Sequence, residues 1–374
     1  MGAHAILSAS SSNRWIHCPP SVRLSEKYED EVSPYALEGT SAHALAECKL
    51  KKILGFNVKD PSDDLDFYDE EMDDLTEGYA SYVTEVISRY ESTAVFVEER
   101  LDLSEYVKES FGTADCVVVG GKDLHVIDLK YGQGVLVDAK DNSQLMLYGL
   151  GALSLFDGIY DIEEVILHIY QPRRCNISTC EIKKIELYEW GETIREIADK
   201  AYKGEGEFSC GEWCIFCKAK NKCRKRAEEN LKLAQEEFTL PPELSDDEIE
   251  KILPRLDEME QWVKDIKAYA LEKAMRGYRW KDLKLVEGRS NRKYRDEDEV
   301  INKVKELGFN PFEEKILGIT AMTKLLGKKV FDENITDLLE KPKGKLTLVS
   351  IRDKREEVVI ENVKEEFGGL NNAK

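Results

Sequence analysis

Asp128 and Lys130 have residue types and a spacing that suit hydrolytic chemistry. Residues 124–130 form a predicted β-strand, and positions i and i+2 of a strand point to one face. Asp115 begins a second predicted strand, 115–119, joined to the first by a glycine-containing hairpin turn. The two carboxylates can therefore meet and offer oxygen ligands to Mg²⁺ or Mn²⁺. A lysine beside such an ion could orient water and stabilise charge on a phosphate.

The acid-any-lysine triplet is weak evidence by itself, because it also occurs at Glu47, Glu181 and Glu313. Its context adds weight. Gln144 and Tyr148 are four residues apart on the helix predicted from about residue 142 to 156, so they share one face. Both could reach a nucleotide or the metal site there. The plainer interpretation is one ordinary polar residue and one half-buried tyrosine.

Four of the nine cysteines lie within residues 210–223, a pattern unlike a secreted disulfide framework. Cys214, Cys217 and Cys223 can bring three thiolates around one ion or cluster. A fourth ligand is required, and Cys210 and Cys18 are the candidates. Proximity in sequence favours Cys210, and four thiolates suit a tetrahedral Zn²⁺ site.

The segments GTAD (112–115), VIDLKYG (126–132) and QLMLY (144–148) resemble the nuclease core of the PD-(D/E)xK superfamily, within it the RecB-like branch. Asp115 follows alanine rather than the proline of that pattern. The resemblance implies an α/β fold of the restriction-endonuclease type, a mixed central sheet flanked by helices. EGTSAH (38–43) matches a G-x-x-x-H motif of the branch, which implies His43 as a further metal ligand. Glu98 is a candidate acid at the edge of the site, although strand phase does not distinguish it from Glu99.

The cysteine spacing is similar to that of the iron–sulfur nucleases of the same branch, including the AddB subunit and CRISPR-associated relatives. Those proteins hold a [4Fe-4S] cluster with one cysteine before the nuclease core and three after it. The resemblance therefore implies Cys18, within residues 8–21, as the fourth ligand and favours iron–sulfur over zinc. The remaining cysteines need only packing or surface roles. The chain also resembles an uncharacterised phage and prophage family, including its segments 285–294 and 344–355.

Composition limits the function classes. Charged residues make up 34% of the chain and hydrophobic ones 42%, as in soluble globular proteins. A net charge of −20 argues against coating nucleic acid over the whole surface but permits a local basic groove. No apolar run is long enough for a membrane span, and no basic segment precedes an apolar core at the start. We expect a cytoplasmic protein, in a bacterial host cell if the phage resemblance holds.

Six basic residues and no acid occur between Cys214 and Arg226. Each of them alone is most simply a solvated surface residue. Together they form a candidate track for a DNA backbone, which we assign to Lys218, Lys220, Lys222 and Arg224. The Pro241-Pro242 pair is the expected boundary between a nuclease domain, residues 1–235, and a mainly helical accessory region, residues 243–374.

The leading hypothesis is a metal-dependent exonuclease acting on single-stranded DNA or DNA ends in phage replication or recombination. His43, Asp115 and Asp128 would hold Mg²⁺ or Mn²⁺, Lys130 would assist the attacking water, and Gln144 and Tyr148 would position the strand. A helicase or recombinase is a conceivable partner. The alternative is a DNA-binding or assembly module that keeps the nuclease fold but cuts little. A zinc-stabilised interaction protein is a third hypothesis.

Overall fold

The computed structural model describes residues 5–29, 34–235, 246–286, 295–312, 316–327, 330–331 and 334–339. The chain divides into two compact units, Met1–Tyr278 and Arg279–Lys374. The expected boundary at residues 241–242 lies outside the described residues. The division that the structure shows falls later, so the helix over residues 246–275 belongs to the first unit. Residues 287–294 and 344–355, which carry most of the C-terminal resemblance, also lie outside the described part.

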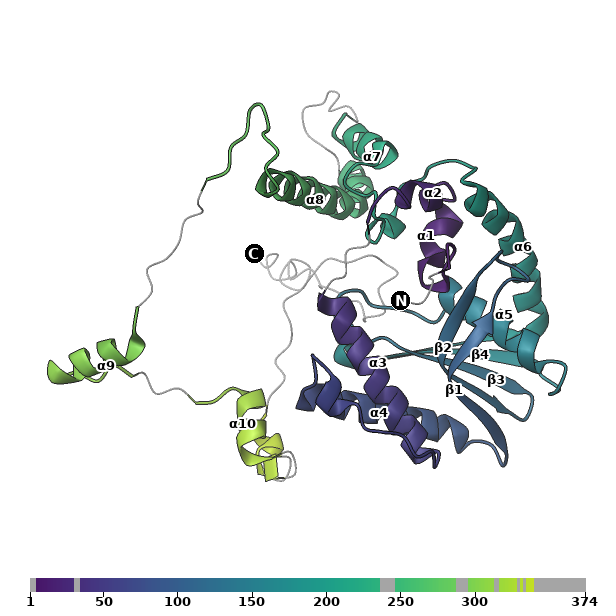
Figure 1. The fold of residues 1–374 in the computed structure, drawn as a ribbon, viewed down its shortest axis with the longest axis horizontal. Coiled ribbons are helices and arrows are strands. Elements are labelled where there is room, and N and C mark those ends of the chain that lie inside the picture. Colours follow the sequence, from purple (N-terminus) through teal and green to yellow (C-terminus); the bar gives the residue numbers. More distant parts are fainter. Residues whose placement is uncertain are drawn as a thin grey trace, which may run out of the picture. The chain divides into compact units, whose positions relative to one another are not determined.

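The first unit contains a five-stranded sheet with helices before, between and after its strands (Figure 1). Its helices are α1 (Ser12–His17), α2 (Ser21–Ser25), α3 (Pro34–Ile53), α4 (Glu70–Ile87), α5 (Ser143–Phe156), α6 (Lys184–Lys203), α7 (Arg224–Gln235) and α8 (Asp246–Met275). Its strands are β1 (Thr93–Asp102), β2 (Phe111–Gly120), β3 (Asp123–Leu129), β4 (Glu164–Gln171) and β5 (Asn176–Lys183). Short 3-10 helices are η1 (Ala9–Ser11), η2 (Ser62–Asp64), η3 (Pro172–Arg174) and η4 (Glu212–Cys214). In the second unit the structure describes α9 (Glu297–Glu306), α10 (Ile319–Leu326) and η5 (Thr336–Leu338).

The strands follow the order β1-β2-β3-β4-β5. Strands β2 and β3 form the predicted antiparallel hairpin, in which Cys116 pairs with Ile127. Strands β3 and β4 are parallel, and α5 provides the crossover that a parallel pair requires. The other neighbouring pairs are antiparallel. The expected mixed α/β architecture with a central sheet flanked by helices is therefore confirmed.

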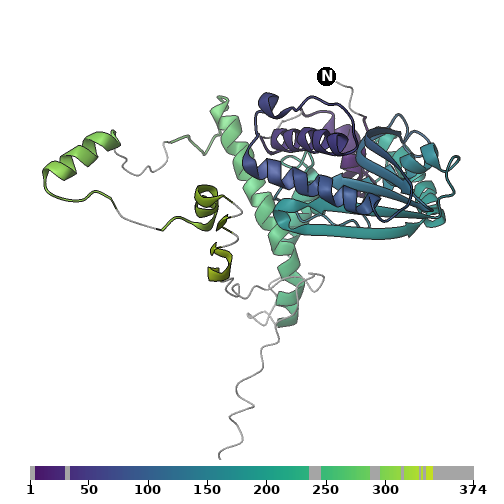
Figure 2. The same ribbon diagram turned by 90° about the horizontal axis from the view of Figure 1, so that it is seen from below.

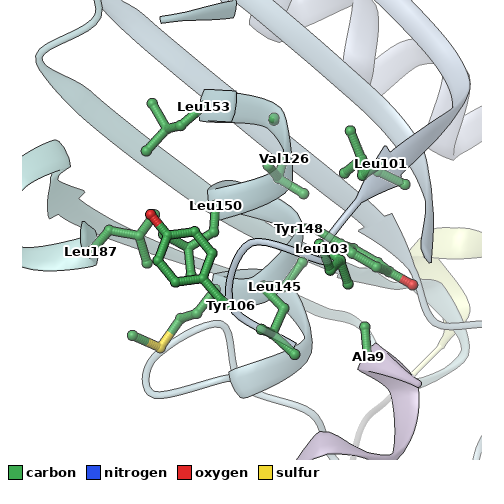
Figure 3. Close-up of a cluster of buried hydrophobic side chains, with 14 of the residues drawn as sticks. Ala9, Leu101, Leu103, Tyr106, Val126, Leu145, Tyr148, Leu150, Leu153 and Leu187 are labelled. Carbon is green, nitrogen blue, oxygen red and sulfur yellow. The ribbon is translucent and has the colours of Figure 1, made fainter. Parts of the chain in front are cut away.

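Helices cover both faces of the sheet, which places two apolar layers around it. On one face, residues of α5 and α6 pack with Val117, Val126 and Leu167 in the larger core cluster, part of which Figure 3 shows. On the opposite face, α3 and α4 pack against Val118 and Ile127 (Figure 2). The alternation of side chains along β2 and β3 explains this division, since neighbouring residues of a strand face opposite sides.

A row of polar side chains lies on the face covered by α4, with two buried histidines at its centre and half-buried residues at its ends. Tyr82 contacts Nδ1 of His168 at 2.8 Å, and Nε2 of His168 lies 2.9 Å from Nδ1 of His125. The row continues from Nε2 of His125 to Tyr90 at 2.7 Å, and Tyr90 donates to Asp123 at 2.6 Å. Burial lowers the pKa of His125 to about 4 and that of His168 to about 3. Both rings are therefore neutral at neutral pH.

In the part of the chain that the structure describes, none of the helices combines the length and the apolar character needed to cross a membrane. The longest of them, α8, continues through Pro254, where the sequence predicts a bend or a break.

Candidate functional site

Three side chains from three elements come together beside the C-terminal end of β3. His43 of α3, Glu98 of β1 and Asp115 of β2 each offer a donor atom, and these atoms lie within 4.8 Å of one another. One imidazole nitrogen and two carboxylates form a donor set that divalent transition metals and Mg²⁺ accept. The group contains the predicted ligands His43 and Asp115. It adds Glu98, which sequence reasoning left undecided.

Glu98 occupies an irregular point of β1. Its φ is +55°, a left-handed value that is uncommon for a residue with a side chain. The strand changes phase at Glu98. Phe96, which precedes it, and Leu101, which follows it, both pack against the larger core cluster, although they are an odd number of residues apart. Two residues on one face of a regular strand would be an even number apart. This phase change explains why alternation alone could not choose between Glu98 and Glu99, both of which are half-buried.

Asp115 is held by two partners. Its Oδ1 lies 3.0 Å from Nδ1 of His43, and its Oδ2 accepts a hydrogen bond from the backbone N–H of Leu129 at 2.6 Å. Burial by itself lowers the pKa of His43, but the attraction of Asp115 outweighs it and raises that pKa to about 9. Burial, reinforced by the charge of Asp115, raises the pKa of Glu98 to about 7. The group thus carries protons that a bound metal would displace.

Asp128 has a buried oxygen without a hydrogen-bond donor among the described residues. Its Oδ1 accepts from Nε2 of Gln144 at 3.3 Å. Its Oδ2 forms an ion pair with Nζ of Lys130 at 2.8 Å, in an orientation outside hydrogen-bond geometry. Only 4% of the Asp128 side chain is exposed, and burial raises the pKa of its carboxyl group. An acceptor left in this state can receive an ion or a donor.

Gln144 connects the catalytic candidates on α5 and β3. Its Oε1 accepts from Nζ of Lys130 at 3.1 Å, and its Nε2 donates to the hydroxyl of Tyr148 at 3.2 Å. A lysine can only donate, so this contact fixes which way the amide points. Asp128, Lys130, Gln144 and Tyr148 therefore form one contact network, as the sequence predicts. Tyr148 is buried, with 6% of its surface exposed, so it supports Gln144 from behind and does not face a strand of DNA.

The four cysteines that the resemblance implies line one narrow cavity. Its walls also include two serines, three apolar or aromatic side chains and three cationic side chains; the lining residues are Arg14, Cys18, Ser21, Leu24, Phe208, Ser209, Trp213, Cys214, Cys217, Lys220, Cys223 and Arg226. Cys18 follows α1, and the other three lie in the segment from η4 to α7. Cys210 does not line this cavity. Its thiol contacts Cys214 and, by hydrogen bonding, lowers the pKa of Cys214 to about 6.

The spacing of these sulfur atoms bears on the choice of metal. Four thiolates around one Zn²⁺ at 2.3 Å would stand about 3.8 Å apart. Among the described residues, no three cysteine sulfurs come within 4.8 Å of one another. The cysteines therefore do not form a closed single-ion site.

The four basic residues of the candidate DNA track differ in their surroundings. Lys218, Lys222 and Arg224 are exposed. Lys222 lies 5.0 Å from the centre of the Tyr269 ring. Lys220 is half-buried, donates to the backbone oxygen of Ile215 and lies 3.6 Å from Asp265. The sequence shows a run of basic residues without acids. It could not show that one of them, Lys220, has partners within the protein.

Comparison with known proteins gives a family and remote structural likenesses. A family model described as "Protein of unknown function (DUF2800)" matches residues 4–356. A solved structure titled "Crystal structure of SSO0001" is 17% identical over 48% of this chain and 94% of its own length, with a TM-score of 0.24. A TM-score that low bears on neither fold nor function.

Proposed function

This chain belongs to the DUF2800 family, and we propose that it is a metal-dependent deoxyribonuclease that hydrolyses phosphodiester bonds. The observation that carries the proposal is the convergence of two arrangements beside the C-terminal end of β3. His43, Glu98 and Asp115 form a compact donor group. Asp128 is buried and forms an ion pair with the ammonium group of Lys130 through Oδ2. Hydrolysis of a phosphodiester uses this combination of metal donors and a nearby cation.

The donor set fits a hard divalent cation. It offers an imidazole nitrogen and carboxylate oxygens, the ligands that Mn²⁺ accepts and, for the oxygens, the ligands that Mg²⁺ prefers. His43, Glu98 and Asp115 would hold the ion, with Asp128 Oδ2 as a further acceptor at the edge. When bound, such an ion lowers the pKa of a coordinated water and neutralises charge on the phosphate.

The residues around the donor group have separate tasks. Lys130 presents an ammonium group to the phosphate. Burial lowers the pKa of this group, but the attraction of Asp128 outweighs burial and raises the pKa, so Lys130 stays charged. Gln144 holds Lys130 and Asp128 in a fixed relation through its two amide atoms. Tyr148 positions Gln144. Preorganised charges of this kind stabilise a transition state because they need not reorient during the reaction.

The cysteine site supports a cofactor of its own. We assign Cys18, Cys214, Cys217 and Cys223 to a structural [4Fe-4S] cluster, with Zn²⁺ as the alternative. The supporting observation is the cavity that all four cysteines line. A cluster there would join the segment before α2 to the segment before α7 and so close a loop of the chain.

DNA with ends or single-stranded regions is the proposed substrate, in phage replication or recombination, where a helicase or recombinase would supply such DNA. Lys218, Lys222 and Arg224 provide exposed positive charge beside the cysteine site. A net charge of −20 confines attraction for the DNA backbone to local surfaces such as this one.

The test is digestion of single-stranded and duplex DNA, labelled at either end, by anaerobically purified protein with Mn²⁺. Lys130→Met should lower the cleavage rate by about 10²–10³-fold while circular dichroism remains unchanged. Lys122→Met is the matched control. Lys122 lies just before β3, whereas Lys130 lies just after it, and Lys122 pairs with Asp161 and Glu163 at the opposite end of the strand. It should cleave at the wild-type rate.

Equal cleavage by wild type and Lys130→Met would refute the assigned site. An intact protein that binds DNA and Mn²⁺ but cleaves neither substrate would support the alternative, a DNA-binding or assembly module on this fold.

A further inference from the structure

The loop between β3 and α5 begins and ends at the candidate site. Lys130 is its first residue, and Gln144 is the second residue of the helix that follows it. The hydrogen bond of 3.1 Å from Nζ of Lys130 to Oε1 of Gln144 joins the two ends of the loop. The backbone N–H of Lys130 also donates to the oxygen of Tyr170 on β4 at 2.9 Å. The loop therefore leaves the sheet beside the residues assigned to phosphate hydrolysis.

A buried glutamine holds this loop close to its starting point. Gln171 is the last residue of β4, and 1% of its surface is exposed. Its Nε2 donates to the backbone oxygens of Gly132 and Val135 at 3.0 and 2.8 Å. Its Oε1 accepts from the backbone N–H of Val137 at 3.2 Å. Because Gln171 directly follows the β4 residue that is bonded to Lys130, these three contacts keep the loop near the ammonium group.

The part of the loop that Gln171 holds is apolar and uncharged. Val135 and Leu136 have 49% and 51% of their surfaces exposed. No charged residue occurs from position 131 to 137, although charged residues make up 34% of the chain. A carboxylate here would repel the phosphates of a substrate, and none is present in these seven positions. The loop thus presents two adjacent aliphatic side chains beside the site.

The faces of the bases are the apolar surface that DNA can offer to such side chains. In a duplex, stacking covers these faces, and the outer surface consists of phosphates, sugars and base edges. In a single strand the bases can unstack and place their faces against protein side chains. Aliphatic side chains, leucine included, are known to contact bases in this way. Val135 and Leu136 therefore suit an unpaired base better than a duplex.

We propose that Val135 and Leu136 contact the face of an unpaired base next to the scissile phosphate, and so make single-stranded DNA the preferred substrate. This inference rests on the proposed function and narrows its substrate class. The contact adds affinity that duplex DNA cannot supply, because its base faces are covered. It also holds the strand beside Lys130, since Gln171 fixes the backbone of the loop at that end of the sheet.

The experiment measures binding to two labelled strands of equal length, one of thymidines and one of abasic sites throughout. The two strands carry the same phosphates, so a difference in affinity reports contacts to bases. Full-length protein is titrated with Ca²⁺ in place of Mn²⁺, and binding is followed by fluorescence anisotropy. Wild type should bind the thymidine strand more tightly by about five- to tenfold, the lower end of what contacts to a base face contribute.

The double variant Val135→Ser, Leu136→Ser should lose this preference and bind the abasic strand as wild type does. The matched control is the double variant Leu155→Ser, Ile159→Ser. These two aliphatic side chains are also exposed, but they lie near the C-terminal end of α5, whereas Gln144 lies near its N-terminal end. The control should keep the wild-type preference.

Equal affinity of wild type for the two strands would overturn the contact without any variant. A Val135→Ser, Leu136→Ser protein that keeps the preference, or that loses affinity equally for both strands, would overturn it as well. Cleavage with Mn²⁺ is measured separately on the same protein. A base preference without cleavage would refute the proposed hydrolysis and leave the base contact standing, whereas cleavage without a base preference would refute this inference alone.

Discussion

The ion pair between Arg226 of α7 and Asp265 of α8 offers a prediction whose size follows from burial. Nη1 of Arg226 lies 2.6 Å from Oδ2 of Asp265, with 4% and 8% of the two side chains exposed. Arg226 has one other described acceptor, the backbone oxygen of Lys220 at 3.4 Å. Asp265→Ala would therefore leave a guanidinium buried with one weak partner. At an effective dielectric constant of about 20, opposite charges about 4 Å apart attract by about 4 kcal/mol.

Removing one partner of such a pair costs about 3–5 kcal/mol, because the remaining charge stays buried. We expect Asp265→Ala to weaken the packing of α8 on α7 by about 3 kcal/mol. Hydrogen exchange of the α8 amides should then be about a hundredfold faster, since each 1.36 kcal/mol is about a factor of ten. Exchange measured by mass spectrometry on the full-length protein resolves a change of that size.

Glu260→Ala on the same helix is the matched control. Glu260 and Lys264 also stand 2.6 Å apart, but about two thirds of each side chain is exposed. Screened surface pairs contribute little, so exchange in α8 should not change. Equal exchange in the two variants would show that burial does not set the strength of the Arg226 pair. A double variant, Arg226→Met with Asp265→Leu, should recover much of the protection, because no unpaired charge remains.

Two further predictions concern the candidate metal site. Gly112→Ala would place a Cβ atom against the ring of Tyr148. It should destabilise the fold by about 1–3 kcal/mol in urea denaturation, and it should lower the cleavage rate because Tyr148 positions Gln144. The control, Gly39→Ala, has no atom within 4 Å of the added Cβ and should change neither stability nor cleavage. Because the pKa of His43 is about 9 without metal and a ligating imidazole must be neutral, Mn²⁺ affinity should fall by up to about tenfold per pH unit from pH 9 to 7. Calorimetry in two buffers of different ionisation enthalpy should detect the released proton, and a pH-independent affinity would contradict the assignment of His43 as a ligand.

Local periodicity predicted which residues share a face within β3 and within α5. Asp128 and Lys130 needed only strand alternation, and Gln144 and Tyr148 needed only helical spacing. The hairpin turn between β2 and β3 then placed Asp115 on the correct side of the sheet. These residues could be predicted because each relation spans a few positions of a regular element.

Relations that depend on irregular backbone or on distant partners could not be predicted in this way. The left-handed φ of Glu98 changes the phase of β1, and no pattern in the surrounding residues marks it. Charge counting could not find that Arg226 is committed to Asp265, because the two residues are 39 positions apart. Placement of α8 in the first unit depends on contacts of that kind.

The row of polar side chains from Tyr82 to Asp123 constrains how β3 can pair with β4. Asp123 accepts the only proton of the Tyr90 hydroxyl, so Nε2 of His125 must donate to Tyr90, and His168 must donate to Nδ1 of His125. Every donor in the row therefore points the same way.

This series of hydrogen bonds requires the register of β3 and β4 in which Ile127 lies opposite His168. A slip of two residues would keep every apolar side chain on its own face, so hydrophobic burial alone would tolerate it. The same slip would separate the two imidazoles and leave ring nitrogens unpaired inside the protein, at about 1–3 kcal/mol each. The two histidines thereby specify the register of β3 against β4.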